Sequence, residues 1–264
     1  MSESDSFMSH LIELKVRLTR SLIALLVVFL GLFYWARDIY SLLAEPMLAK
    51  LPPGTQMIAV EVASPFFVPI KVTMFASLII ALPYILYQVW AFVAPGLYSH
   101  EKKLVLPLIA TSTLLFVIGM AFAYFIVFPV VFNFITQFAP EGVSVMTDIQ
   151  KYFDFVLTLF LAFGVAFETP IAVVLLTRMG IVSIEKLKAA RPYVVVGAFV
   201  VAAIFTPPDV VSQLLLAFPL WLLYEMGLVI SGWMGKSDTQ EEDGESKPEL
   251  ENKAGQSGPD TPAS

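Results

Sequence analysis

Two carboxylates, Glu101 and Glu13, are the residues best placed to bind a charged ligand, since both lie beside basic residues just outside long apolar runs. A carboxylate can hold a guanidinium group through two parallel hydrogen bonds, so this pair is suited to a basic peptide. Each carboxylate also has a simpler interpretation. Glu101 falls in the first turn of a helix that Ser99 can cap, and Glu13 precedes Arg17 by four residues, the spacing of an ordinary helical ion pair.

A third carboxylate, Glu168, lies inside an apolar run, where charged groups are rare and are functional candidates by default. Three roles fit it: a proton relay, a contact with a polar group of another subunit, or a protonated group in the bundle interior. Asp209 and Gln213 follow near the start of the last apolar run, where Asp209 is suited to cap a helix and Gln213 lies one turn further on.

The sequence predicts no catalysis and no cofactor. It has no cysteine, and His10 and His100 have no acidic residues at metal-ligand spacing. It also has no phosphate-binding loop and no Gly-x-Ser-x-Gly nucleophile motif. Nothing in its charge pattern indicates nucleic-acid binding.

Composition predicts an integral membrane protein. The 264 residues are 58% hydrophobic and 14% charged, whereas a soluble domain is nearer 45–50% apolar and about 25% charged. Backbone groups in lipid must bond within the chain, and the apolar runs are apolar on all sides, which favours helices over a barrel. The expected fold is therefore all-α.

The apolar runs predict six transmembrane helices, at residues 21–36, 72–92, 104–128, 155–177, 193–206 and 210–233. The fourth is interrupted at Glu168 and Pro170. The fifth has 14 residues, ~21 Å of helix against a hydrocarbon core of ~30 Å, so the last two helices form a short hairpin. The alternative is a fifth helix extended at its start through Pro192.

Three segments complete the expected organisation. Residues 1–20 form an amphipathic helix that lies in the membrane interface before the chain turns into the bilayer. The prolines of residues 37–70 exclude a long helix there, leaving a short interfacial one at 39–44. Residues 236–264 form a disordered acidic tail after the membrane domain of residues 21–235.

Basic residues predict the orientation. Twelve of them fall on the side of the N-terminus, the C-terminus and Glu101, and four fall on the other side. The positive-inside rule then places both termini in the cytoplasm.

Seven short motifs resemble those of the TatC family, the multi-spanning subunit of the twin-arginine protein translocase. They are His10-Leu-Ile-Glu-Leu14, Ala63-Ser-Pro-Phe-Phe67, Tyr87-Gln-Val-Trp-Ala-Phe92, Glu101, Phe163-Gly-Val-Ala-Phe-Glu168, Arg191-Pro-Tyr193 and Thr206-Pro-Pro-Asp209. Each motif is weak alone, but their order and spacing over residues 7–235 make the set specific.

The resemblance implies a receptor for signal peptides with paired arginines in a bacterial cytoplasmic (inner) membrane. It implies export of folded cargo with TatA- and TatB-type single-span partners, self-association in a larger complex, and the proton-motive force as energy source. The signal-peptide contacts it implies are Glu101, Glu13, Phe92, Leu97, Lys15 and Arg17. It also implies a membrane glutamate at Glu168, outer-face positions at Pro46 and Asp209, and a polar contact for partner helices at Thr206 and Gln213.

Two other functions predict different behaviour. A proton-coupled secondary transporter working through Glu168 requires several ionisable residues facing one another near the midplane. An assembly scaffold without receptor function tolerates loss of Glu101.

Overall fold

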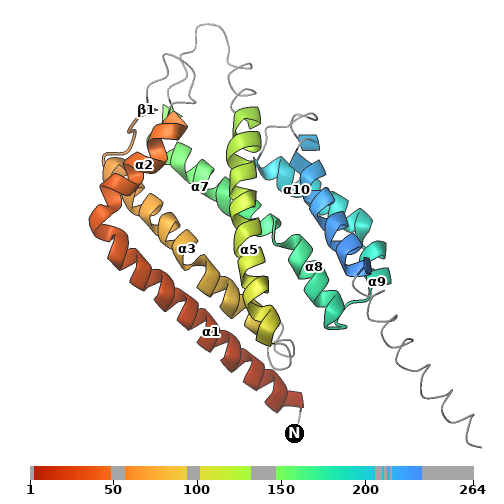
Figure 1. Ribbon diagram of the computed structural model, residues 1–264. Coiled ribbons are helices and arrows are strands. Elements are labelled where there is room, and N and C mark those ends of the chain that lie inside the picture. Colours follow the sequence, from red (N-terminus) through yellow and green to blue (C-terminus); the bar gives the residue numbers. More distant parts are fainter. Residues whose placement is uncertain are drawn as a thin grey trace, which may run out of the picture.

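The protein is a bundle of long helices whose ends gather at two opposite faces (Figure 1). The computed structural model describes residues 3–48, 57–93, 102–131, 147–205, 210, 213–214 and 216–233. In chain order its elements are α1 (Glu3–Leu32), the 3-10 turn η1 (Phe33–Trp35), α2 (Ala36–Leu48), β1 (Met57–Ile58), α3 (Ser64–Val93), α5 (Lys102–Phe122), the π-helical turn η2 (Ala123–Val127), β2 (Thr147–Asp148), α7 (Ile149–Ala166), α8 (Thr169–Arg178), α9 (Ile184–Ala189) and α10 (Arg191–Phe205). A final helix covers Leu216–Trp233.

Five apolar stretches of the described residues are long enough to cross a membrane, namely Met8–Glu45, Ser64–Val93, Val105–Val131, Ile149–Arg178 and Leu216–Trp233. The shorter apolar helix α10 has 15 residues, ~22 Å, and falls short of a ~30 Å core. It begins at Arg191 and takes in Pro192, as the extended alternative required, yet it remains short. The predicted all-α membrane fold is confirmed.

The predicted turn between an interfacial helix and a first span near residue 20 is wrong. α1 continues without a break from Glu3 to Leu32, because these residues contain no proline and a single glycine, Gly31, next to the end. Thirty residues make ~45 Å of helix, longer than the ~30 Å core. The first turns of α1 therefore extend beyond the hydrocarbon region.

The prolines of residues 37–70 interrupt the chain less than predicted. α2 runs to Leu48 with Pro46 in its last turn, and α3 begins at Ser64, eight residues before the expected start. Pro65 stands in the first turn of α3, where its missing N–H has no helical partner to lose. Pro69 lies one turn further in and removes one backbone donor.

The predicted interruption of the fourth span is confirmed. α7 ends at Ala166 and α8 begins at Thr169, with Pro170 in the first turn of α8. The Thr169 hydroxyl donates to the carbonyl of Ala166 at 2.6 Å, which satisfies a backbone acceptor at the break. Glu168 is thus part of the turn that joins α7 to α8.

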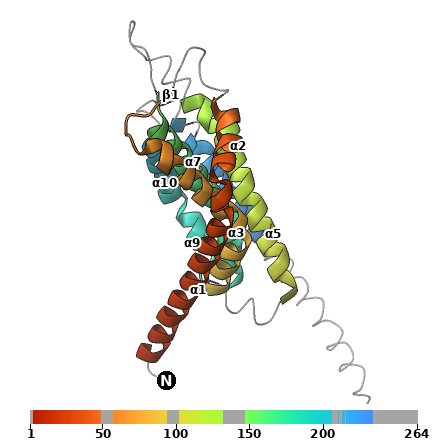
Figure 2. The same cartoon turned by 90° about the vertical axis from the view of Figure 1, so that its left-hand side faces the viewer.

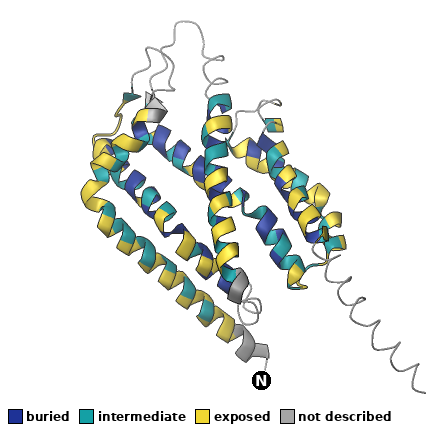
Figure 3. Cartoon of the chain, in the orientation of Figure 1, coloured by how far each residue is buried: buried dark blue, intermediate teal, exposed yellow. Residues whose placement is uncertain are grey.

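The core lies where α3, α5 and α7 meet. Buried aromatic and aliphatic side chains fill it, including Phe153, Leu159 and Phe163. α1 packs along α3 and stays on the outside of the bundle (Figures 1 and 2). The burial map shows α1 exposed or half-buried along its length, in contrast to α3 and α7 (Figure 3).

The face of the molecule opposite the N-terminus is held by polar contacts. β1 pairs in parallel with β2, Met57 opposite Thr147 and Ile58 opposite Asp148. At the start of α3, the Ser64 hydroxyl donates to Oε1 of Gln150 in α7 at 2.8 Å. The tail predicted at residues 236–264 lies outside the described residues.

Candidate functional site

The first candidate site is a polar cluster where α1 packs on the last turns of α3. Arg17 donates from Nε and Nη2 to Glu13 Oε1 at 2.9 and 2.6 Å. Its Nη1 also reaches Oε1 of Gln88, a buried residue of α3, at 3.4 Å. The predicted ion pair between residues four apart on α1 is therefore present, and it is anchored to a second helix.

This cluster leaves one carboxylate oxygen available. Both bonds from Arg17 end on Oε1 of Glu13, and Oε2 has no hydrogen-bond partner among the described residues. The Glu13 side chain keeps 35% of its surface exposed, so a donor from outside can reach it. Lys15 is exposed on the same helix and forms no ion pair within the described part of the chain.

A stacked pair of rings lies one turn away from the cluster. His10 of α1 and Phe92 of α3 stack with centroids 4.4 Å apart and planes 20° apart. Because aromatic stacking favours a fixed approach of two helices, this pair sets how the start of α1 meets the end of α3. Phe92, predicted as a peptide contact, is half-buried and already has an intramolecular partner.

Glu101 and Leu97 lie outside the described residues. Their flanks are described: α3 ends at Val93 and α5 begins at Lys102. Both helix ends lie at the face of the molecule where α1 begins (Figure 1). The chain on either side of Glu101 therefore starts from the same face as the Glu13 cluster.

The second candidate site is a buried polar chain centred on Glu168. Trp90 of α3 donates from Nε1 to Ser112 Oγ of α5 at 2.8 Å, and the Ser112 hydroxyl donates to Glu168 Oε2 at 2.7 Å. The other carboxylate oxygen, Oε1, is buried without a hydrogen-bond partner among the described residues. Its surroundings are apolar, with Leu86 and Phe116 in the adjacent cluster.

An unpartnered buried oxygen is costly, because the group has lost water and gained nothing in return. Glu168 Oε1 can therefore accept a proton, or a hydrogen bond from an incoming group, at a buried position. No second ionisable side chain of the described residues joins the Trp90–Ser112–Glu168 chain. The polar path that a proton-coupled transporter requires is not present in this part of the protein.

The sequence did not indicate two polar pairs that the structure shows. Ser112 stands in an apolar run, and its hydroxyl was the one signal that could have suggested a partner for Glu168. Lys71 of α3 donates to both oxygens of Asp154 of α7 at 2.6 and 3.0 Å. These two residues are 83 positions apart, so no local spacing indicates their contact.

Of the remaining predicted positions, Gln213 is the one whose side chain the structure describes. Gln213 donates from Nε2 to the carbonyl of Phe199 at 3.1 Å, so its amide links the final part of the chain to α10. Thr206 and Asp209 lie outside the described residues. Pro46 belongs to the last turn of α2, and its side chain is likewise outside the described part.

Comparison with known families decides how these features are to be interpreted. The model of the family described as "Sec-independent protein translocase protein (TatC)" matches residues 9–219. The chain belongs to the TatC family. The resemblance carried by the seven motifs is thereby confirmed.

Relatives from distant bacteria support the assignment. The TatC protein of Escherichia coli K12 is 56% identical over 92% of this chain and 94% of its own length. That of Aquifex aeolicus is 42% identical over 88% of this chain and 95% of its own. A crystal structure titled as the twin arginine translocase receptor TatC in DDM superposes with a TM-score of 0.74 at 42% identity, covering 84% of this chain and 99% of that one.

TatC membership makes this chain a membrane-spanning component of a twin-arginine protein translocase. Protein transport is thus the class of function, and the small-solute transporter loses its support. The Glu13 cluster and the Glu168 chain are two polar sites of the described structure that can serve such a function.

Proposed function

We propose that this chain is the subunit that receives twin-arginine signal peptides, and that the arginine pair binds at the face where α1 begins. Glu13 and Glu101 are the proposed partners of the two guanidinium groups, with Lys15, Arg17, Phe92 and Leu97 beside them. The observation that carries the proposal is the Glu13 cluster. In this cluster Arg17 holds the Glu13 carboxylate through Oε1, and Oε2 stays open. The cluster lies against the end of α3, from which the chain continues to Glu101.

The chemistry of the cluster favours a guanidinium over an ammonium ligand. Arg17 already shows the mode of binding, since two of its nitrogens converge on one carboxylate oxygen. A planar guanidinium can approach Oε2 from the open side in the same way, whereas an ammonium offers a single, strongly hydrated point of contact. The apolar part of a signal peptide can then lie along the apolar helices.

The proposed orientation places this face in the cytoplasm. The start of α1, the start of α5 and the end of α8 lie at one face of the molecule (Figure 1), and they bring most of the membrane-proximal basic residues with them. The positive-inside rule assigns such a face to the cytoplasm of a bacterial inner membrane. Peptides that have not yet been exported arrive from that side.

The proposal extends to the partners and the energy source. TatA- and TatB-type single-span subunits are expected to contact the region of Thr206, Asp209 and Gln213, where α10 is too short to span the bilayer alone. Glu168, with its unpartnered Oε1, is the proposed acceptor for a polar group of a partner helix or for a proton during transport driven by the proton-motive force.

Site-specific crosslinking tests the receptor role. A photo-crosslinker at position 101 is offered a twin-arginine signal peptide or its Arg-Arg→Lys-Lys version, and export is measured in Glu101→Ala and Glu13→Ala. Glu185→Ala is the matched control, because Glu185 is an exposed carboxylate of α9, outside the proposed site. We expect a crosslink that requires the arginines and export that fails without Glu101. A crosslink indifferent to the arginines, with export intact, rejects the proposal.

A further inference from the structure

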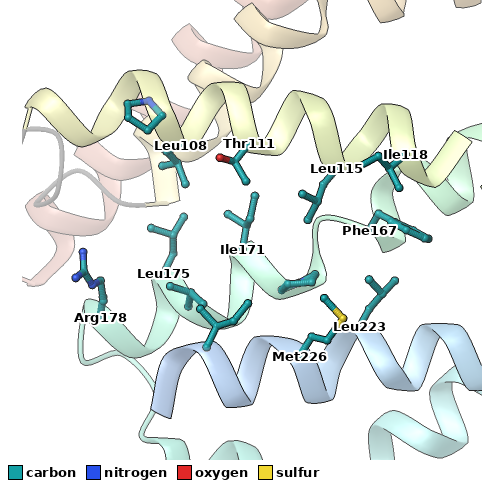
Figure 4. Close-up of a pocket in the computed structure, with 14 residues that line it drawn as sticks. Leu108, Thr111, Leu115, Ile118, Phe167, Ile171, Leu175, Arg178, Leu223 and Met226 are labelled. Carbon is teal, nitrogen blue, oxygen red and sulfur yellow. The ribbon is translucent and has the colours of Figure 1, made fainter. Parts of the chain in front are cut away.

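An apolar groove runs between α5, α8 and the helix Leu216–Trp233, and neither α1 nor α3 contributes a lining residue to it. Its cavity measures about 570 Å³ and is lined by fourteen residues, of which Thr111 and Arg178 are the polar ones. The close-up shows Arg178 at one end of the row of lining side chains, with Ile118 and Phe167 at the other (Figure 4). The groove opens at the surface, since Ile118 and Met226 are 45% and 46% exposed.

The position of the groove determines what can enter it. All three helices that form it belong to membrane-spanning stretches, so the surrounding solvent is lipid. Partner helices prefer surfaces of small residues, whereas Leu108, Leu115 and Leu223 project here. A single acyl chain fits this narrow space.

Arg178 adds charge at one end. It is the last residue of α8, at the face of the molecule where α1 also begins (Figure 1), and its side chain is exposed. It forms no ion pair or hydrogen bond through its side chain with any described residue, unlike Arg191 nearby, which pairs with Glu225 at 2.7 Å. A guanidinium at the membrane surface, at one end of the apolar groove, complements the phosphate of an anionic lipid.

We propose that this groove is a binding site for one anionic phospholipid, with an acyl chain between α5, α8 and the last helix and its phosphate on Arg178. The proposal concerns a surface separate from the peptide site and does not depend on it. It gives a role to an arginine that, among the described residues, has no ion-pair partner at the end of a strongly apolar groove.

Native mass spectrometry of the full-length protein tests the proposal. The protein in a neutral detergent is offered phosphatidylglycerol or phosphatidylcholine, and the retained lipids are counted. We expect Arg178→Gln to lower retention of phosphatidylglycerol about fivefold, while phosphatidylcholine changes little. Arg178→Lys should keep most of the preference. Lys188→Gln is the control, because Lys188 is an exposed cation on α9 that does not line the groove.

Filling the groove tests the position of the acyl chain. Thr111→Phe and, independently, Met226→Trp should lower retention of both lipids, and a thermal melt of each variant shows that it is folded. Equal losses in Arg178→Gln and Lys188→Gln would mean diffuse surface attraction and overturn the proposal. So would full lipid retention in both folded groove-filled variants, or a photo-crosslinker at position 226 that captures a single-span subunit and no lipid.

Discussion

The close crossing of α5 and α7 depends on the absence of a side chain at Gly119. A Cβ built on this α5 residue would lie 2.5 Å from the carbonyl oxygen of Phe163 in α7. No real Cβ approaches a backbone oxygen so closely, and a backbone atom cannot move aside by changing rotamer. Gly119→Ala must therefore push α5 and α7 apart over the part of the core that surrounds Phe163 and Phe167.

Two opposing effects set the size of the change. Overpacking a core by a methyl group costs about 1–3 kcal/mol, and replacing a mid-helix glycine by alanine returns about 0.5–1 kcal/mol through lower backbone entropy. The clash is larger, so we expect Gly119→Ala to lower the free energy of unfolding by about 0.5–2 kcal/mol. For a chain of this size that corresponds to a Tm lower by roughly 1–8 °C.

Thermal unfolding of the purified protein in one detergent measures the change, with Gly197→Ala as the matched control. Gly197 is also a helical glycine in an apolar span, but its Cβ would meet nothing within 4 Å. Its alanine variant should be as stable as the parent or slightly more so. Two results would contradict the role of Gly119 in close packing of α5 on α7. One is a Tm of Gly119→Ala equal to that of the parent, and the other is a Tm of Gly197→Ala lowered by the same amount as that of Gly119→Ala.

Two further predictions concern polar contacts between helices. Ser112→Ala removes the donor to Glu168 Oε2 and the acceptor of Trp90, so it should destabilise the protein by about 1–3 kcal/mol. A double-mutant cycle with Glu168→Ala should show a coupling energy above ~0.5 kcal/mol, and additive effects would contradict the contact. Lys71→Ala should lower the free energy of unfolding by less, up to ~1 kcal/mol, because the Lys71 and Asp154 side chains are 42% and 40% exposed. A larger loss of stability would contradict a screened ion pair, and so would a swapped pair, Lys71→Asp with Asp154→Lys, that recovers none of the lost stability.

The sequence was sufficient to predict those features that depend on a single local segment. Membrane spans are set by the length of an apolar run, and the break at Glu168 follows from Pro170, which cannot continue a backbone hydrogen-bond ladder. The Glu13–Arg17 pair is equally local, because four residues make about one helical turn. These features were predicted and are present.

Other features depend on how distant segments pack. Gly119 and Gly164 are 45 residues apart, and no local pattern indicates that each admits a neighbour from the other helix. The same holds for the partner of Glu168 and for Lys71 with Asp154. The error over α1 has a different cause: apolar residues at i, i+4 and i+7 describe an interfacial helix and the first turns of a protruding span equally well.

The last two turns of α3 connect the two polar sites, and the helical period explains how. Gln88 and Phe92 are four residues apart and face α1, where they meet Arg17 and His10. Trp90 lies between them in sequence and points to the other side, toward Ser112 and Glu168. One short stretch of helix therefore positions the surface carboxylate of Glu13 and the buried carboxylate of Glu168 together. A ligand that displaces α1 from α3 acts on the same turns that hold the Glu168 chain.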